Sequence, residues 1–289
     1  MTIAAGFVCL DGIVLCADTQ ETISGYTKNN TEKIRTWQDQ GLCIAITGAG
    51  DSELIETVGG LIQDALIADY LPSSVRMNDV VRDLIQEVIS DCFIKFIVPY
   101  APFPSGERPS IELLIAVLVD NEANNYQVLY KASGNTVREI SPGADCIGTG
   151  LILAKSLIER FYSPFMNLDE MVLAACYIMF QTKKWVDGCG GKTDIVIASY
   201  QKQCFSGISS GDVESLEKHF DDSDEWLRIL LIDFANPNAD PMNTQKIVAL
   251  ARSQSEKSLE KMLSSGSRLP DLLKRLGRSI PSTSQEDSQ

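Results

Sequence analysis

The chain opens with two apolar segments, residues 2–9 and 13–19, that flank the Asp-Gly pair at 11–12. An Asp-Gly pair between two apolar runs is typical of a β-hairpin. We therefore predict a hairpin whose first strand begins almost at the first residue. A further strand is predicted over residues 42–47, and the glycines within 48–51 predict a turn after it.

Helical periodicity follows in two blocks. Apolar residues recur three and four apart over residues 52–70, and three more helices are predicted over 77–96, 151–161 and 168–184. Between and after these blocks we predict a proline-rich loop and three strands: 99–109, then 113–119, 126–132 and 194–199. This order predicts an α+β fold, a four-layer αββα sandwich, because two helix pairs on the outer faces of two sheets would bury every apolar face.

The character of the chain changes after about residue 211. Residues 212–240 carry nine acidic and two basic side chains, and residues 244–263 form a moderately amphipathic helical pattern. The Ser-rich, polar end of the chain is typical of disorder. We expect one domain over 2–211, an acidic and then helical extension over 212–278, and a disordered tail over 279–289.

Charge and histidine content exclude several classes of function. The 289 residues include 25 Lys and Arg against 39 Asp and Glu, a formal net charge of −14, which argues against nucleic-acid binding. The single histidine, His219, lies in the charged run 217–221, which is typical of a solvated helix face. We therefore expect chemistry that needs no histidine.

The eight cysteines show no C-x-x-C spacing, so the sequence does not predict a zinc site or a redox pair. We expect no metal and no cofactor. The first twenty residues lack a basic region, which argues against a signal peptide, and the longest charge-free apolar stretch, 171–182, is too short to span a bilayer. The expected location is the cytoplasm, with no membrane partner.

Thr2 is a candidate nucleophile. We expect removal of Met1, because an initiator methionine is generally trimmed before a small residue. Thr2 would then carry a hydroxyl and a free α-amine on one residue. An α-amine has a pKa near 8, so it can take the proton from the hydroxyl at neutral pH without a histidine.

The residues around Thr2 extend this pattern. Two short segments farther along the chain are relevant, Ala17-Asp18-Thr19-Gln20 and Glu32-Lys33-Ile34. These segments resemble the β-type proteasome subunits and their bacterial peptidase relatives, which are N-terminal-nucleophile hydrolases. Thr2, Asp18 and Lys33 match the family's three catalytic positions, with one residue deleted between Asp18 and Lys33. Lys33 would favour the ionised hydroxyl and keep the amine neutral, and Asp18 would orient Lys33.

The resemblance implies further site residues. Gly48 would donate its backbone N–H to the oxyanion at the start of the first helix. Thr149 would stand in for a supporting serine, Asp187 for a supporting aspartate, and Cys189 replaces a second serine. A thiol is a weaker hydrogen-bond donor than a hydroxyl, so this support is weakened. Cys189 as the nucleophile itself is an alternative, but no histidine is available to activate it.

By the same resemblance, Ile46 would form the floor of a substrate pocket and Glu21 its rim. Thr31, Lys33 and Arg35 would share one face of a strand, so that Thr31 and Arg35 flank the site. An apolar floor beside charges of both signs indicates no substrate preference.

The function implied is hydrolysis of peptide or unfolded-protein amide bonds through an acyl-enzyme on Thr2. The resemblance also implies a homo-oligomeric ring and an ATPase or other regulator as partner. Two alternatives remain open: a non-catalytic structural subunit of such a ring, and an N-terminal-nucleophile amidase or acyl-transferase that acts on a small substrate.

Overall fold

The computed structural model describes residues 2–23, 27–39, 41–68, 77–104, 108–121, 124–199, 202–235, 242, 245–250 and 253. Contacts along the chain separate two compact units, Met1–Ser210 and Gly211–Gln289. The predicted tail over 279–289 and most of the predicted helix over 244–263 lie outside the described residues.

The first unit contains two antiparallel sheets, each of five strands within the described residues, and the first of them carries the start of the chain. Its strand order is β10-β1-β2-β11-β12. The predicted hairpin forms its centre, where β1 pairs with β2 across the turn at Leu10 and Asp11. The strands are β1 (Ile3–Cys9), β2 (Gly12–Asp18), β10 (Ala144–Gly148), β11 (Thr193–Ser199) and β12 (Lys202–Gly207).

The second sheet is a meander in which each strand pairs with the next along the chain, in the order β5-β6-β7-β8-β9. Its strands are β5 (Ile34–Asp39), β6 (Leu42–Gly50), β7 (Ile111–Asn121), β8 (Asn124–Ser133) and β9 (Thr136–Ile140). A separate short hairpin of β3 (Gln20–Ile23) and β4 (Thr27–Asn30) joins the two sheets along the chain.

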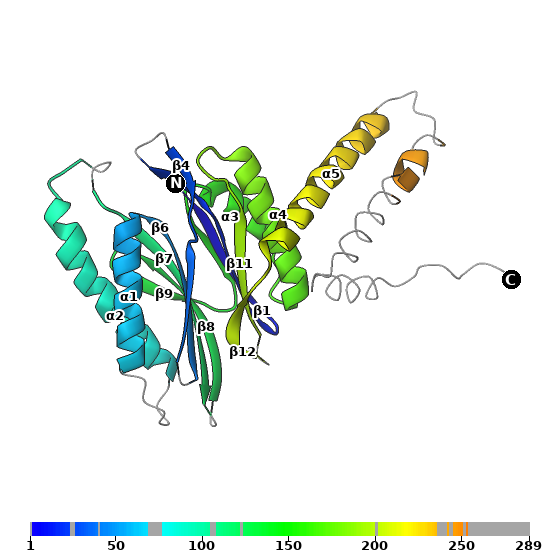
Figure 1. Cartoon of the computed structure of the whole chain (residues 1–289). Helices are drawn as coiled ribbons and strands as arrows, with labels where there is room; N and C mark the ends of the chain where they lie inside the picture. The colour runs from blue at the N-terminus through cyan, green and yellow to red at the C-terminus, as the bar shows by residue number, and fades with distance from the viewer. Residues whose placement is uncertain are drawn as a thin grey trace. The chain divides into compact units, whose positions relative to one another are not determined.

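Two pairs of helices cover the outer faces of the sheets (Figure 1). Helices α1 (Ser52–Ala68) and α2 (Met77–Cys92) lie on the second sheet, and α3 (Leu151–Phe161) and α4 (Leu168–Trp185) lie on the first. One apolar core lies between α1, α2 and the second sheet, and another lies between the two sheets. The predicted α+β four-layer αββα sandwich is therefore confirmed.

The structure corrects two local predictions beside the candidate site. Residues 48–50 do not form the predicted turn, because β6 stays paired with β7 as far as Gly50 opposite Ile111. The chain turns only at Gly50, whose φ is +126°, where a Cβ would lie 2.0 Å from the Ser110 carbonyl oxygen. Residues 31–33 are not part of a strand, because β5 begins only at Ile34 and the Thr31 N–H donates instead to the Thr19 carbonyl.

Other differences are additions to the prediction. The periodicity of residues 77–96 covers α2 and a π-helical turn, Phe93–Ile97, which a 3₁₀ turn at Val98–Tyr100 follows. Strands β3, β4, β9, β10 and β12 were not predicted.

Helix α5 (Ser210–Ala235) is 26 residues long, belongs to the second unit from Gly211 onward, and takes up most of the acidic segment. Residues 245–250 are also helical. Among the described residues, no helix combines the length and the apolar character that crossing a bilayer requires.

Candidate active site

Asp18 forms the base of the candidate site. It is the last residue of β2, the central strand of the first sheet, and all seven residues of β2 are buried. Its carboxylate accepts the Ile3 N–H at 3.2 Å and the Gly190 N–H at 2.9 Å. These bonds fix the carboxylate between the first strand and the segment that follows α4.

The β3–β4 hairpin brings Lys33 back to Asp18. Gln20 pairs with Asn30 in this hairpin, and the Thr31 N–H donates to the Thr19 carbonyl at 2.8 Å. The chain therefore returns to the end of β2 immediately before Lys33. The two halves of the sequence motif meet although fourteen residues separate them.

The Lys33 ammonium group has three donors, and the structure uses each of them. Nζ lies 2.6 Å from Thr2 Oγ1, 2.8 Å from Asp18 Oδ1 and 2.5 Å from the Gln20 carbonyl oxygen. The Thr2 hydroxyl accepts from Lys33, so its own proton stays available to a base. Lys33 can stabilise negative charge on Oγ1 in this position.

The charges at the base are strongly desolvated. The Asp18 side chain is 0% exposed and that of Lys33 is 11% exposed. Burial raises the pKa of the Asp18 carboxyl above its ordinary value, while the Lys33 charge and the N–H groups of Gly190 and Ile3 oppose this rise. The ion pair is therefore what compensates a carboxylate at this depth.

The three predicted supporting residues, Thr149, Asp187 and Cys189, lie in different surroundings from one another. Cys189 is buried near the base, where burial and the Asp18 charge raise the pKa of its thiol to about 11. Thr149 lies in the exposed turn between β10 and α3 and lines a cavity together with Thr2. Asp187 is exposed in the turn after α4, and no hydrogen bond joins it to Thr2 or Cys189 within the described residues.

Gly48 lies in β6 and not in a turn, but its lack of a side chain has a clear reason. A Cβ there would lie 2.7 Å from Cγ2 and 2.9 Å from Cγ1 of Ile55, and 2.9 Å from Cδ2 of Leu113. Helix α1 can thus pack closely on β6 only over a glycine. Gly48 also lines the cavity beside Thr2.

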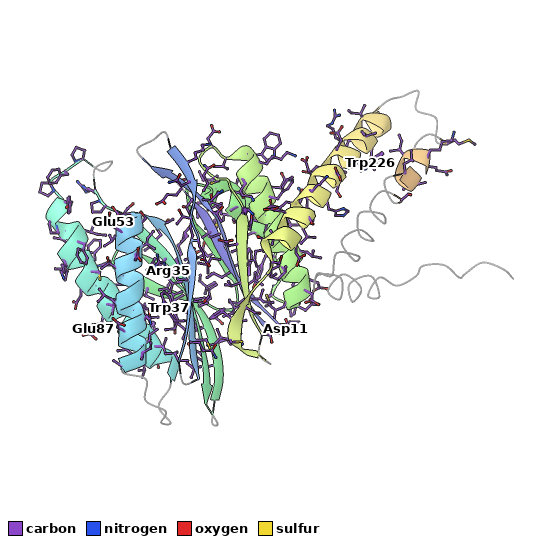
Figure 2. The ribbon with its side chains drawn as sticks, in the orientation of Figure 1. Asp11, Arg35, Trp37, Glu53, Glu87 and Trp226 are labelled. Atoms are coloured by element: carbon purple, nitrogen blue, oxygen red, sulfur yellow. The ribbon has the colours of Figure 1, made fainter. Side chains whose placement is uncertain are left out.

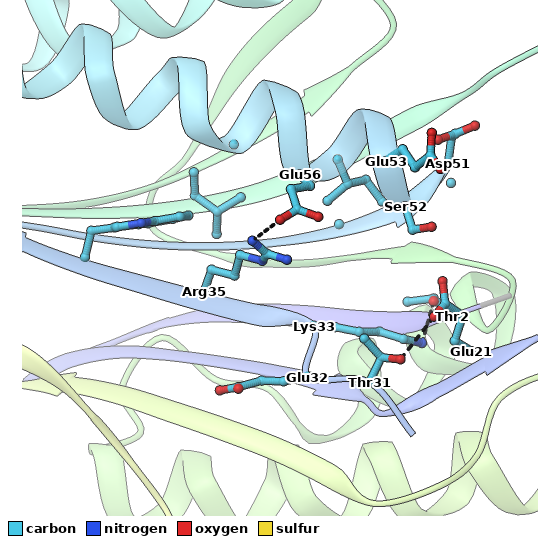
Figure 3. Close-up of a pocket in the computed structure, with 16 residues that line it drawn as sticks. Thr2, Glu21, Thr31, Glu32, Lys33, Arg35, Asp51, Ser52, Glu53 and Glu56 are labelled. Carbon is cyan, nitrogen blue, oxygen red and sulfur yellow. Dashed lines mark hydrogen bonds and ion pairs between the residues drawn. The ribbon is translucent and has the colours of Figure 1, made fainter. Parts of the chain in front are cut away.

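A cavity of about 640 Å³ opens beside Thr2 and Lys33 (Figure 3). All four predicted substrate-binding residues line it: Glu21, Thr31, Arg35 and Ile46. Glu21 accepts from the Thr31 hydroxyl at 3.0 Å, and Arg35 pairs with Glu56 of α1 at 2.8 Å. Thr31 and Arg35 reach the cavity although they lie on either side of the start of β5.

A second cavity of about 560 Å³ also reaches Thr2. It shares Thr2 and Gly50 with the first cavity and extends over the π-helical turn, where Phe93 and Ile97 line it. Thr2 therefore lies where two cavities meet.

Solved structures of three Anbu proteins are similar to this chain. An Anbu Gly-1 mutant from Hyphomicrobium sp. strain MC1 is 16% identical, with 77% of this chain and 94% of that chain covered and a TM-score of 0.61. Anbu (ancestral beta-subunit) from Yersinia bercovieri is 16% identical, with 81% and 97% covered and a TM-score of 0.61. The Anbu complex from Pseudomonas aeruginosa, a helical assembly, is 14% identical, with 83% and 99% covered and a TM-score of 0.63. The likeness lies in the fold.

These comparisons correct the family assignment made from the motifs. No protein-family model and no curated protein matches the chain. The assignment to the β-type proteasome subunits and their bacterial peptidase relatives is therefore wrong, since the similar structures are Anbu proteins at 14–16% identity. What the chain shares with these Anbu proteins is the fold.

Several residues of the site were not predicted from the sequence. The Gln20 carbonyl and the Gly190 N–H bind Lys33 and Asp18 through the backbone, which gives no signal in the residue type. Glu53 and Glu56 line the first cavity from one face of α1. Their spacing of three residues at a helix start was a usable signal, since it places both on the same face.

Within the described residues, no group of three or more His, Cys, Asp or Glu side chains lies close enough together to hold a metal ion.

Proposed function

We propose that the chain is a threonine-type peptidase that hydrolyses amide bonds through an acyl-enzyme on Thr2. The observation that carries this proposal is the position of Lys33 Nζ, 2.6 Å from Thr2 Oγ1 and 2.8 Å from Asp18 Oδ1. A largely buried lysine that donates to a hydroxyl at the meeting point of two cavities is suited to activating that hydroxyl.

The proposed reaction begins after removal of Met1. The α-amine of Thr2 takes the proton from Oγ1, and Oγ1 attacks the carbonyl carbon of the substrate. The C–N bond then breaks, the proton passes to the leaving amine, and an ester remains on Thr2. Water adds to this ester, the C–O bond breaks, and Oγ1 regains its proton while the acid product leaves.

The surrounding groups would stabilise charge during these steps. Lys33 lies where negative charge develops on Oγ1, and Asp18 keeps Lys33 in place. The Gly48 N–H would bind the oxyanion, close to the start of α1, where a helix N-terminus favours negative charge. Thr149, Asp187 and Cys189 remain proposed supporting residues.

A non-catalytic subunit is the second candidate, and one observation favours it. Asp187, which would support the Thr2 amine, is exposed and makes no hydrogen bond to the site within the described residues. A chain that kept the fold without this support would still assemble. The main proposal also includes assembly into a homo-oligomer. This homo-oligomer would receive peptides or unfolded proteins from an ATPase or another regulator. Its place would be the cytoplasm, whose reducing conditions suit eight free cysteines.

The test is the intact mass of the purified protein before and after treatment with a β-lactone. Loss of Met1 and one adduct that maps to Thr2 are expected, and Thr2→Ala should abolish the adduct. Retention of Met1, or a free Thr2 that never reacts, would contradict the proposed peptidase activity. The non-catalytic subunit would then be the remaining candidate.

A further inference from the structure

The cavity beside Thr2 carries an excess of negative charge. Among the described residues that line it, five are carboxylates and two are cations. The carboxylates are Glu21, Glu32, Asp51, Glu53 and Glu56, and the cations are Lys33 and Arg35. Figure 3 shows Glu53 and Glu56 on α1 and Asp51 just before its first residue, across the cavity from Thr2 and Lys33.

Both cations are already paired. Lys33 binds Asp18 beneath the cavity, and Arg35 binds Glu56 at 2.8 Å. The Glu53 carboxylate has no hydrogen-bond or ion-pair partner among the described residues, although the Glu53 backbone carbonyl accepts from the Thr57 hydroxyl, and the side chain is exposed in the first turn of α1. The charge left over for a ligand is therefore negative.

The remaining surface of the cavity is apolar. Trp37, Ile46 and Ile55 line it, and Ile46 is buried. Gly59 keeps space open there, since a Cβ on it would meet only Trp37, at 3.9 Å. Figure 2 shows Arg35, Trp37 and Glu53 on the same side of the first unit, along α1 and the neighbouring strand. The cavity thus combines an apolar wall with carboxylates.

We propose that this cavity selects a lysine or arginine side chain next to the carbonyl that Thr2 attacks. This inference rests on the proposed function. The aliphatic stem of such a side chain packs on apolar surface while its charged head reaches polar groups. Here the stem lies along Trp37, Ile46 and Ile55, and the head reaches the carboxylates of α1. An acidic substrate side chain would meet like charges, which excludes it.

The test compares three tripeptide vinyl sulfones that differ only in the residue beside the reactive group: arginine, norleucine or glutamate. Norleucine matches the aliphatic stem without the charge. The rate of labelling of Thr2 should be at least about tenfold higher for arginine than for norleucine, which corresponds to one ion pair of ordinary strength, and lowest for glutamate.

Two variants should change the ratio of the arginine to the norleucine labelling rate in opposite directions. Glu53→Gln removes an unpaired carboxylate and should lower the arginine preference about threefold, whereas Arg35→Gln releases Glu56 and should raise it by a similar factor. Asp64→Asn, an exposed position farther along α1 and outside the cavity, removes the same charge and should leave the ratio unchanged.

The outcomes separate the two proposals. Faster labelling by the norleucine probe would overturn the selectivity while Thr2 remains the nucleophile. An equal change of the arginine-to-norleucine ratio in all three variants would overturn it as well. If no probe labels Thr2, the proposed function fails instead. In that case, calorimetry measures the binding of acetyl-Ala-Ala-Arg-amide and its norleucine analogue to the Thr2→Ala protein. Tighter binding of the arginine peptide would support the selectivity. Equal binding of the two peptides would overturn it.

Discussion

Lys33 and Arg35 lie two residues apart in the sequence, and each forms an ion pair. The two pairs have the same length but different surroundings. Lys33–Asp18 and Arg35–Glu56 both span 2.8 Å between nitrogen and oxygen. The side chains of the first pair are 11% and 0% exposed, and those of the second are 51% and 62% exposed. The first pair forms the base of the site, and the second lies at the rim of its cavity.

This contrast separates the part of the site that must stay intact from the part that can vary. At the base, the Asp18 carboxylate is fully buried and the Lys33 ammonium largely so, and the loss of Lys33 would leave an uncompensated buried charge on Asp18. At the rim, water and salt screen both charges, so the pair contributes little to stability. Substitutions at the rim should therefore leave the fold intact, so that they can test the proposed selectivity.

The largest expected effect comes from breaking the base. Lys33→Met leaves Asp18 buried without its partner, and the free energy of unfolding should fall by about 3–5 kcal/mol. Labelling of Thr2 should be lost as well. Urea unfolding and β-lactone labelling measure the two effects.

A double variant separates stability from chemistry. Asp18→Asn with Lys33→Met removes both charges, so most of the lost stability should return while Thr2 stays unreactive. A loss below about 1 kcal/mol in Lys33→Met would show that the pair is not desolvated, and that base and rim do not differ as described.

Gly48, which lines the cavity beside Thr2, should give the next largest effect. Gly48→Ala pushes a methyl group against Ile55 and Leu113, and overpacking of this kind costs about 1–3 kcal/mol. Gly60→Ala is the matched control, because nothing lies within 4 Å of a Cβ at this position in α1. This control should gain about 0.5–1 kcal/mol from helix propensity. Equal effects in the two variants, measured by thermal unfolding, would contradict the close packing of α1 on β6.

The sequence predicted the parts of the molecule whose signals are local. The Asp-Gly hairpin and the helical periodicity of α1, α3 and α4 depend on neighbouring residues, and so they predicted the two sheets and their helix layers. Thr2 was singled out because it follows Met1 in a chain with a single histidine, and Asp18 and Lys33 because their short motifs resemble those of a known family. The structure brings these three together, and their catalytic role stays a proposal.

The remaining parts depend on contacts that the sequence does not encode locally. The glycines of residues 48–51 predicted a turn, but pairing with β7 extends β6 to Gly50. Thr31 was expected in a strand, yet its N–H binds the Thr19 carbonyl across the β3–β4 hairpin. The carboxylates of α1 face the cavity only because α1 packs over β6, a tertiary contact. The short motifs also matched a family to which the comparisons give no support.

The rim pair should contribute much less than the base. Arg35→Gln and Glu56→Gln should each change the free energy of unfolding by less than about 1 kcal/mol, and added salt should reduce this change further. Urea unfolding at low and high salt checks both points. A loss comparable with that of Lys33→Met would contradict the contrast between the two pairs.

The smallest effect on the reaction is expected from Cys189, which lies at the base but carries no charge. Its pKa of about 11 lies above the ordinary 9.0, so the thiol stays protonated at neutral pH and is a poor nucleophile. Cys189→Ala should therefore keep the rate of Thr2 labelling within about threefold. Because the pKa is raised, alkylation of Cys189 by iodoacetamide should increase about tenfold per pH unit up to pH 10, without a plateau. Peptide mass mapping follows this rate. A plateau near pH 8 would mean that the thiolate forms despite burial, and Cys189 would then replace Thr2 as the group to test first.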